Sequence, residues 1–170
     1  MALEVGATLA QVQAGLQAVQ PVAGRLIAHR LSTGAVLVDD SYNANPGSVA
    51  AAIDTLASGA GQAWLVLGDM RELGADALLL HAQVGQQAKA AGIARLFTLG
   101  PLSAHAANAF GAGAQQFDSH AALAEALGNA LRAGVTVLVK GSRGSAMDNI
   151  VTALLARDAA SGKENTTDAA

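Results

Sequence analysis

Short runs of large apolar residues alternate with alanine-rich stretches along most of the chain, and this alternation limits the folds open to it. The runs at residues 36–38, 63–67, 96–99 and 135–139 are almost entirely apolar and predict buried strands, and a shorter strand is expected at 115–117. The stretches between them predict helices at 46–57, 76–91, 103–110, 119–132 and 146–157. Strands that alternate with helices in this way are typical of a parallel sheet covered on both faces.

The two ends of the chain add to this pattern. Ser32-Thr33-Gly34 separates two segments, 25–31 and 35–39, and predicts a hairpin. The predicted fold is therefore α/β, a Rossmann-like, mostly parallel sheet with helices on both faces and an antiparallel edge hairpin. A first helix is expected at 8–19, and the small, polar residues 158–170 are expected to form a disordered tail.

Composition excludes several classes of protein. The chain has no cysteine, which excludes disulfide scaffolds, cysteine nucleophiles and thiolate zinc sites. Its net charge of −3 and its scattered charges argue against a nucleic-acid partner. No apolar run approaches the roughly 20 residues that span a bilayer, and the first residues lack a basic signal-peptide region. We therefore expect a soluble, cytoplasmic domain with no membrane partner and no metal site.

A polar loop at residues 39–47 follows the first predicted buried strand. It carries Asp40, Tyr42, Asn43 and Asn45, which offer acceptors for ribose hydroxyls and donors for a carboxylate or an amide. Ligands of open α/β sheets bind at the carboxyl ends of the strands, which favours a functional loop. In the alternative interpretation, Asp40 and Asn45 only cap the following helix.

A second loop, at residues 140–145, joins the last strand to the last helix. It carries Lys140, Ser142, Arg143 and Ser145, a set of cations and hydroxyls that suits an anion at a helix N-terminus. The loop lacks the pattern of a nucleotide phosphate loop. The alternative is an ordinary loop with solvated charges.

The remaining polar residues carry weaker signals. Asp69 and Glu72, in the loop at 68–74, are either paired carboxylates for acid–base chemistry or part of a structural, salt-bridged loop. His81 falls within a predicted helix without a partner at metal-ligand spacing, so we expect it to be a packed histidine. Arg25 is isolated in the sequence and on that ground alone reads as a surface arginine.

Four strings together carry a family resemblance. Gly24-Arg25-Leu26, the DDSYNANP string at 39–46, the GDM and ELG strings within 68–74, and the VKGSR string at 139–143 resemble the C-terminal domain of the Mur ligases. The resemblance covers about residues 8–156. Within the family, the string at 40–45 is similar to that of the member that joins D-alanyl-D-alanine to UDP-N-acetylmuramoyl-tripeptide. Three segments are implied: the end of a central ATPase domain (1–20), the C-terminal domain (21–157) and the tail (158–170).

The resemblance also implies a reaction and residue roles. ATP would phosphorylate the tripeptide carboxylate, and the amine of D-alanyl-D-alanine would then attack the acyl phosphate. Arg25 would contact the ATP phosphates and Asp40 the ribose, as catalytic and nucleotide-binding residues, with Tyr42 and Asn43 beside them. The dipeptide would be held by residues of both loops, namely Asn43, Asn45, Lys140, Ser142, Arg143 and Ser145.

A complete Mur ligase also has an N-terminal domain and a central domain with a phosphate loop. We expect these domains as partners, with the Mg²⁺ ligands in the central domain, so this chain alone would be an inactive monomer. Two alternatives stay open. One is the C-terminal domain of another amide ligase, such as a folylpolyglutamate synthetase. The other is a non-catalytic, flavodoxin-like binding module. Such modules have an acidic cluster and a lysine, which would be imitated here by Asp39, Asp40, Asp69 and Lys140.

Overall fold

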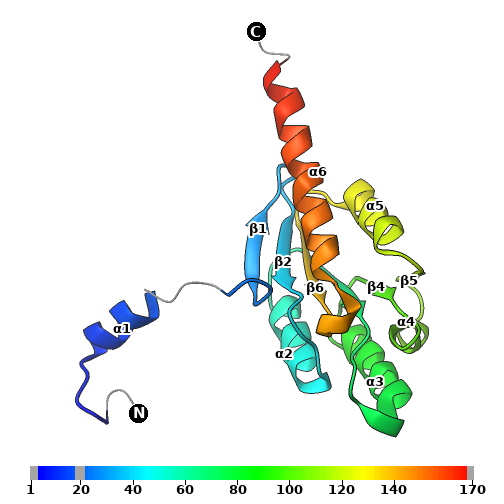
Figure 1. Cartoon of the computed structure of the whole chain (residues 1–170), viewed down its shortest axis with the longest axis horizontal. Helices are drawn as coiled ribbons and strands as arrows, with labels where there is room; N and C mark the ends of the chain where they lie inside the picture. Colours follow the sequence, from blue (N-terminus) through cyan, green and yellow to red (C-terminus); the bar gives the residue numbers. More distant parts are fainter. Residues whose placement is uncertain (1–3, 18–21, 168–170) are drawn as a thin grey trace.

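The computed structural model describes residues 4–17 and 22–167, which build one six-stranded sheet flanked by helices (Figure 1). The strand order is β1-β2-β6-β3-β4-β5. β1 is antiparallel to β2, and every other neighbouring pair is parallel, which confirms the predicted fold class. The strands are β1 (Ile27–Arg30), β2 (Val36–Asp40), β3 (Gln62–Gly68), β4 (Arg95–Leu99), β5 (Ala114–Phe117) and β6 (Val135–Lys140).

Helices cover both faces of the sheet. One face carries α2 (Pro46–Ala57), α3 (Ala77–Ala90) and α4 (Ser103–Phe110), and the other carries α5 (His120–Ala130) and α6 (Asp148–Thr167). Side chains of β3 alternate between the two cores: Trp64 and Val66 pack with α5 and α6, whereas Leu65 and Leu67 pack with the other three helices. This double burial explains why the central strands read as continuous apolar runs.

Three of the helices that cover the sheet differ from expectation. α5, expected at 119–132, is shorter by one residue at its start and by two at its end. The helix expected at 76–91 begins one residue later, because a 3-10 turn, η1 (Gly74–Asp76), leads into α3. α6 continues to Thr167, so the segment 158–167, expected to belong to a disordered tail, is helical. Asp158 gives α6 an anchor there, since its Oδ1 accepts hydrogen bonds from the amide nitrogen (2.8 Å) and hydroxyl (2.6 Å) of Ser32 in the hairpin turn.

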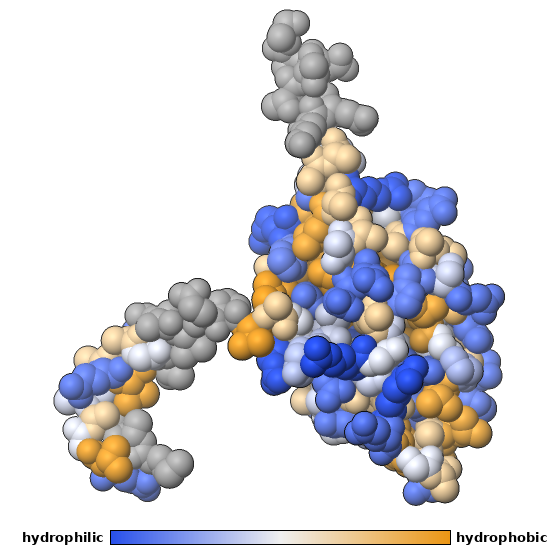
Figure 2. Space-filling model, in the orientation of Figure 1, coloured by the Kyte–Doolittle hydropathy of each residue, from blue (hydrophilic) through white to orange (hydrophobic). Residues whose placement is uncertain are grey.

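The first helix, α1 (Leu9–Gln17), lies apart from the sheet (Figure 1). The Thr8 hydroxyl accepts a 3.3 Å hydrogen bond from the amide of Gln11, as expected of the residue that begins the helix. The expected end of this helix at residues 18–19 lies outside the described residues. None of the helices described is both long and apolar enough to cross a membrane. In Figure 2 the apolar residues on the visible face form small patches separated by hydrophilic ones.

The direction of the connections creates a crevice at the carboxyl edge of the sheet. The chain leaves β2 and β3 toward the face of α2 and α3, but it leaves β6, which lies between them, toward α6 on the opposite face. Connections that diverge in this way leave a gap where ligands bind in open α/β sheets. The loops after β2, β3 and β6 border this gap.

Candidate functional site

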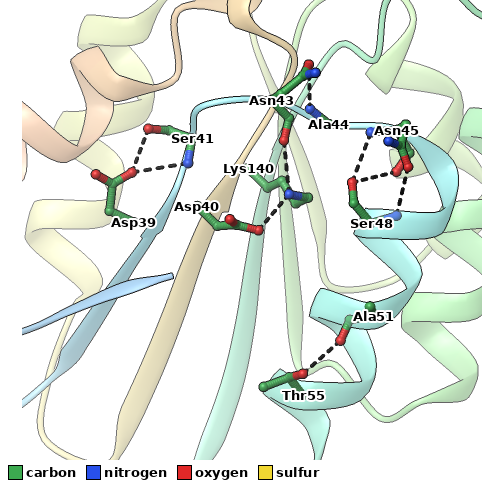
Figure 3. Close-up of polar contacts among 10 residues, drawn as sticks. All are labelled: Asp39, Asp40, Ser41, Asn43, Ala44, Asn45, Ser48, Ala51, Thr55 and Lys140. Carbon is green, nitrogen blue, oxygen red and sulfur yellow. Dashed lines mark hydrogen bonds and ion pairs between the residues drawn. The ribbon is translucent and has the colours of Figure 1, made fainter. Parts of the chain in front are cut away.

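The end of β2 separates two neighbouring carboxylates. Asp39 points to the α6 side of the sheet, and its Oδ1 accepts hydrogen bonds from the amide (3.1 Å) and hydroxyl (2.5 Å) of Ser41. Asp40 points to the α2 side, where it meets Lys140 (Figure 3). Since successive side chains of a strand lie on opposite faces, the two carboxylates do not act as a pair.

Lys140 ends β6 as the direct ladder partner of Asp40. Its Nζ donates to Asp40 Oδ2 at 2.6 Å and to the carbonyl oxygen of Asn43 at 3.0 Å (Figure 3). The lysine side chain is 4% exposed and the Asp40 side chain 15%. A buried ammonium is costly without a counter-charge, so this ion pair is part of the local fold.

The ring of Tyr42 contacts two arginine side chains. Gly24 has a φ of +73°, and its carbonyl accepts a 3.0 Å hydrogen bond from the amide of Tyr42. This contact sets the guanidinium of Arg25 4.5 Å from the centre of the Tyr42 ring, and Arg143 approaches the same ring at 5.8 Å. Both arginines are exposed, so the aromatic ring holds two cations at the mouth of the crevice.

A cavity of about 440 Å³ lies between β2, the Gly24 turn and α2. Its polar wall contains six of the predicted site residues, and Leu26, Ala51 and Ala52 provide an apolar wall. A cation, a carboxylate and an apolar wall in one cavity suit a ligand that combines phosphate, sugar hydroxyls and a flat base. The six predicted residues are Arg25, Asp40, Tyr42, Asn43, Asn45 and Lys140.

A second cavity, of about 390 Å³, lies on the other side of the loop formed by residues 42–45. Ser142 and Arg143 line it together with Arg71, to which the sequence assigned no role. Arg71 packs tightly against Gly144, where an added Cβ would come within 2.8 Å of its Nε. Its only signal in the sequence is its place after a buried strand, between Asp69 and Glu72.

The hydroxyls of the β6–α6 loop are occupied within the protein. Ser142 Oγ donates to the carbonyl of Asp69 at 2.6 Å, and Ser145 Oγ donates to the carbonyl of Ser142 at 2.6 Å. These bonds hold the loops after β3 and β6 together. A carboxylate ligand only accepts hydrogen bonds, and both hydroxyl protons are already used. Arg143, in contrast, is exposed and lines the second cavity.

Two other candidates, Asn45 and Asp69, have structural contacts. Asn45 caps α2, since its Oδ1 accepts from the amide of Ser48 at 2.9 Å while the Ser48 hydroxyl accepts from the Asn45 amide at 3.1 Å. Asp69 Oδ1 accepts from the amides of Leu102 (3.1 Å) and Ser103 (2.7 Å) at the start of α4. Both side chains therefore satisfy backbone groups. Capping, the structural alternative for residues 39–47, holds for Asn45 but not for Asp40, which pairs with Lys140. Asp69 is structural as the alternative for its loop had it, but through backbone amides and not through the expected salt bridge.

His81 is fully buried, which confirms that it is a packed histidine. Its Nε2 accepts a 2.9 Å hydrogen bond from the amide of Met70, and its Nδ1 lies 2.7 Å from the carbonyl of Ala77. An amide can only donate and a carbonyl can only accept, so the proton is on Nδ1. Within the described residues, no group of three histidine, aspartate or glutamate side chains could hold a metal ion.

Residues 7–143 match the family model described as Mur ligase, glutamate ligase domain. The chain is 44% identical over 155 residues to the UDP-N-acetylmuramoyl-tripeptide–D-alanyl-D-alanine ligase of Escherichia coli, which covers 91% of this chain and 34% of that protein.

Solved structures give the same result for the fold. MurF from Acinetobacter baumannii matches with a TM-score of 0.79 and 28% identity over 90% of this chain and 35% of that one. The MurF ligase of Thermotoga maritima in complex with ADP matches with a TM-score of 0.78 and 22% identity, over the same shares of the two chains. The chain thus spans about a third of the length of these relatives. The match over most of its length shows that the chain belongs to the Mur ligase family, as a glutamate ligase domain.

Proposed function

We propose that this chain is the C-terminal domain of an ATP-dependent ligase that joins D-alanyl-D-alanine to UDP-N-acetylmuramoyl-tripeptide in peptidoglycan synthesis. The cavity that brings Arg25, Asp40 and Tyr42 together at the carboxyl edge of the sheet carries this proposal. The 44% identity to the E. coli ligase of that name supports the choice of substrates.

The first cavity is the proposed nucleotide site. Arg25 neutralises the ATP phosphates as charge moves to the leaving ADP. Asp40 uses Oδ2 to bind Lys140 and keeps Oδ1 for a ribose hydroxyl. Tyr42 and Asn43 border the nucleotide on the loop side.

The second cavity is the proposed site for the incoming dipeptide. Arg143 and Arg71 supply donors for its carboxylate, and the amide groups of Asn43 and Asn45 face the same space. Ser142 and Ser145 contribute by fixing the loop that carries Arg143. The two cavities share Tyr42, Asn43 and Asn45, an arrangement that suits two substrates that meet during one reaction.

The reaction has two steps. A carboxylate oxygen of the tripeptide attacks the γ-phosphorus of ATP, ADP leaves, and an acyl phosphate forms. The dipeptide amine then attacks the acyl carbon, and inorganic phosphate and a proton leave as the amide forms. In this chain, Arg25 stabilises the phosphoryl charge and Arg143 positions the nucleophile.

Magnesium does not fit the residues described here. Asp40 is the carboxylate that lines the first cavity, and the Lys140 ammonium already occupies one of its oxygens. We therefore place the Mg²⁺ ligands and the phosphate loop in a central domain outside this chain. We assign residues 1–20 to the end of that domain, which the separate position of α1 supports, and residues 21–157 to the glutamate ligase domain. The ligase would act as a cytoplasmic monomer.

The test compares this chain with a ligase that contains it together with a phosphate-loop domain. Supplied with ATP, the tripeptide nucleotide and D-alanyl-D-alanine, the complete ligase should release one ADP per amide formed, while the chain alone releases none. ADP formation by the chain alone that depends on both other substrates would refute the proposal. A complete ligase that accepts glutamate and not the dipeptide would support the folylpolyglutamate alternative instead.

A further inference from the structure

We propose that Lys140 is a positioning residue, which holds Asp40 for the ribose and fixes the loop between the two cavities, and that it does not bind the dipeptide carboxylate. The inference rests on the proposed function, since it concerns how that nucleotide site is held in shape. It reverses the direct role that the lysine was expected to have.

The ammonium group of Lys140 is buried. Lys140 stands in the centre of the sheet edge, between β2 and β3, and its side chain is 4% exposed. Asp40, its partner, is 15% exposed and lines the open cavity. A ligand entering this cavity therefore reaches the carboxylate more readily than the ammonium behind it.

The ammonium group already has hydrogen-bond partners within the protein. Two of its three donors are used, one on Asp40 Oδ2 at 2.6 Å and one on the Asn43 carbonyl at 3.0 Å (Figure 3). Turning Nζ toward a dipeptide carboxylate in the second cavity would break both bonds and leave Asp40 without its counter-charge. The ion pair selects one orientation of the carboxylate and directs the other oxygen toward the cavity.

The contacts of Lys140 connect the two cavities. Asp40 lines the first cavity, and Asn43 lines both. Lys140 therefore holds the ribose acceptor directly and the shared loop through its backbone. Loss of the lysine should disturb ribose recognition first, because a carboxylate released from the ammonium swings toward water.

The experiment measures ribose recognition in the complete ligase. The substrates are ATP and its 2′-deoxy and 3′-deoxy analogues, and kcat/KM is determined for each with D-alanyl-D-alanine at saturation. Wild-type enzyme should prefer ATP over at least one analogue by about tenfold or more, the effect of one hydrogen bond to a charged group. Lys140→Met should reduce this preference to about twofold or less and raise the KM for ATP more than the KM for the dipeptide.

Further variants separate loss of the positioning of Asp40 from a general loss of folded structure. Lys140→Arg keeps the charge and should restore part of the ribose preference. Asp40→Asn should abolish the preference, and the double variant should be no worse than either single one, because the two residues act as a unit. If Lys140→Met folds poorly, Lys140→Arg and Asp40→Asn still report on the ribose preference. Lys89→Met, on the exposed side of α3, is the control and should keep the full preference.

Two results would overturn the inference. One is a Lys140→Met enzyme that keeps the ribose preference while its KM for the dipeptide rises, which would make the lysine a dipeptide contact. The other is a wild-type ligase that joins the dipeptide without distinguishing ATP from either analogue. Failure of the proposed function gives a different result, in which the wild-type ligase forms no amide with D-alanyl-D-alanine.

Discussion

The guanidinium of Arg25 lies 4.5 Å from the centre of the Tyr42 ring, although the two residues come from different sides of the β1–β2 hairpin. The contact depends on a backbone hydrogen bond of 3.0 Å from the Tyr42 amide to the Gly24 carbonyl. An exposed arginine ordinarily samples many conformations, and the ring restricts this one to the rim of the nucleotide cavity. Preorganisation of this kind matters most for a group that stabilises charge in a transition state.

Replacing Arg25 by alanine in the complete ligase should therefore lower kcat more than it raises the KM for ATP. We expect a fall in kcat of about 100- to 1,000-fold, the size of effect seen when one transition-state donor is removed. Steady-state kinetics with saturating dipeptide measures both constants. Arg30→Ala, at the exposed end of β1, is the matched control and should stay within about twofold of wild type. An unchanged kcat/KM in Arg25→Ala would make Arg25 a purely structural residue.

The turn at Gly24 should tolerate no side chain. Its φ is +73°, and an added Cβ would lie 2.9 Å from the Tyr42 amide nitrogen. Gly24→Ala should lower the free energy of unfolding of this chain by about 1–3 kcal/mol, through backbone strain and the clash. Urea unfolding followed by circular dichroism measures the change.

Gly47→Ala is the control for this turn, because it lies in the same loop region at the start of α2. Its added Cβ would meet only Asn45 Oδ1, at an ordinary 3.6 Å. The free energy of unfolding should change by no more than about 0.5 kcal/mol. Equal losses in the two variants would show that the Gly24 conformation is not required.

The order of strands and helices was predictable because its signals are local. Continuous apolar runs such as residues 63–67 mark strands buried on both faces, and Ser32-Thr33-Gly34 marks the hairpin. The polar loops after β2 and β6 could also be located, since the carboxyl ends of parallel strands meet at one edge. The fold class alone also predicted that the two loops lie side by side, and both line the second cavity.

The side-chain contacts at that edge of the sheet could not be predicted, because the residues that form them are distant in the sequence. Lys140 and Asp40 are 100 residues apart, and Ser142 meets Asp69 across 73 residues. Without these contacts, a lysine and a serine in a glycine-rich loop resemble free ligand-binding groups. The position of Arg71 was unpredictable for the same reason, since only the packing of its loop on Gly144 brings it to the second cavity. α6 extends past its predicted end, and there Asp158 contacts Ser32, which is 126 residues away.

His81 should be among the most sensitive positions for stability outside the site. His81→Ala leaves the buried amide of Met70 without its 2.9 Å acceptor and opens a cavity between α3 and the loop after β3. We expect a loss of about 2–4 kcal/mol in the free energy of unfolding, measured by urea denaturation. His105→Ala, at a half-buried position on α4, should cost less than about 1 kcal/mol. If His81→Ala also lowered the free energy of unfolding by less than about 1 kcal/mol, a water molecule would have to replace the imidazole as the acceptor.

The arginines of the second cavity should determine affinity for the dipeptide. Arg143→Ala in the complete ligase should raise the KM for D-alanyl-D-alanine by about 10- to 100-fold, since it removes a charge-assisted hydrogen bond, and the KM for ATP by less than about threefold. Arg71→Ala should act in the same direction. The diagnostic substrate is D-alanyl-D-alaninamide, which lacks the carboxylate charge and should be a poor substrate for wild type.

Arg143→Ala should discriminate less between the dipeptide and its amide than wild type does, because the group that recognises the charge is gone. Arg157→Ala is the matched control, since this arginine donates to Asn129 at 2.8 Å on the α5–α6 side of the molecule. Its discrimination should equal that of wild type. An Arg143→Ala enzyme whose two KM values rise equally, with full discrimination retained, would place the dipeptide carboxylate outside this cavity.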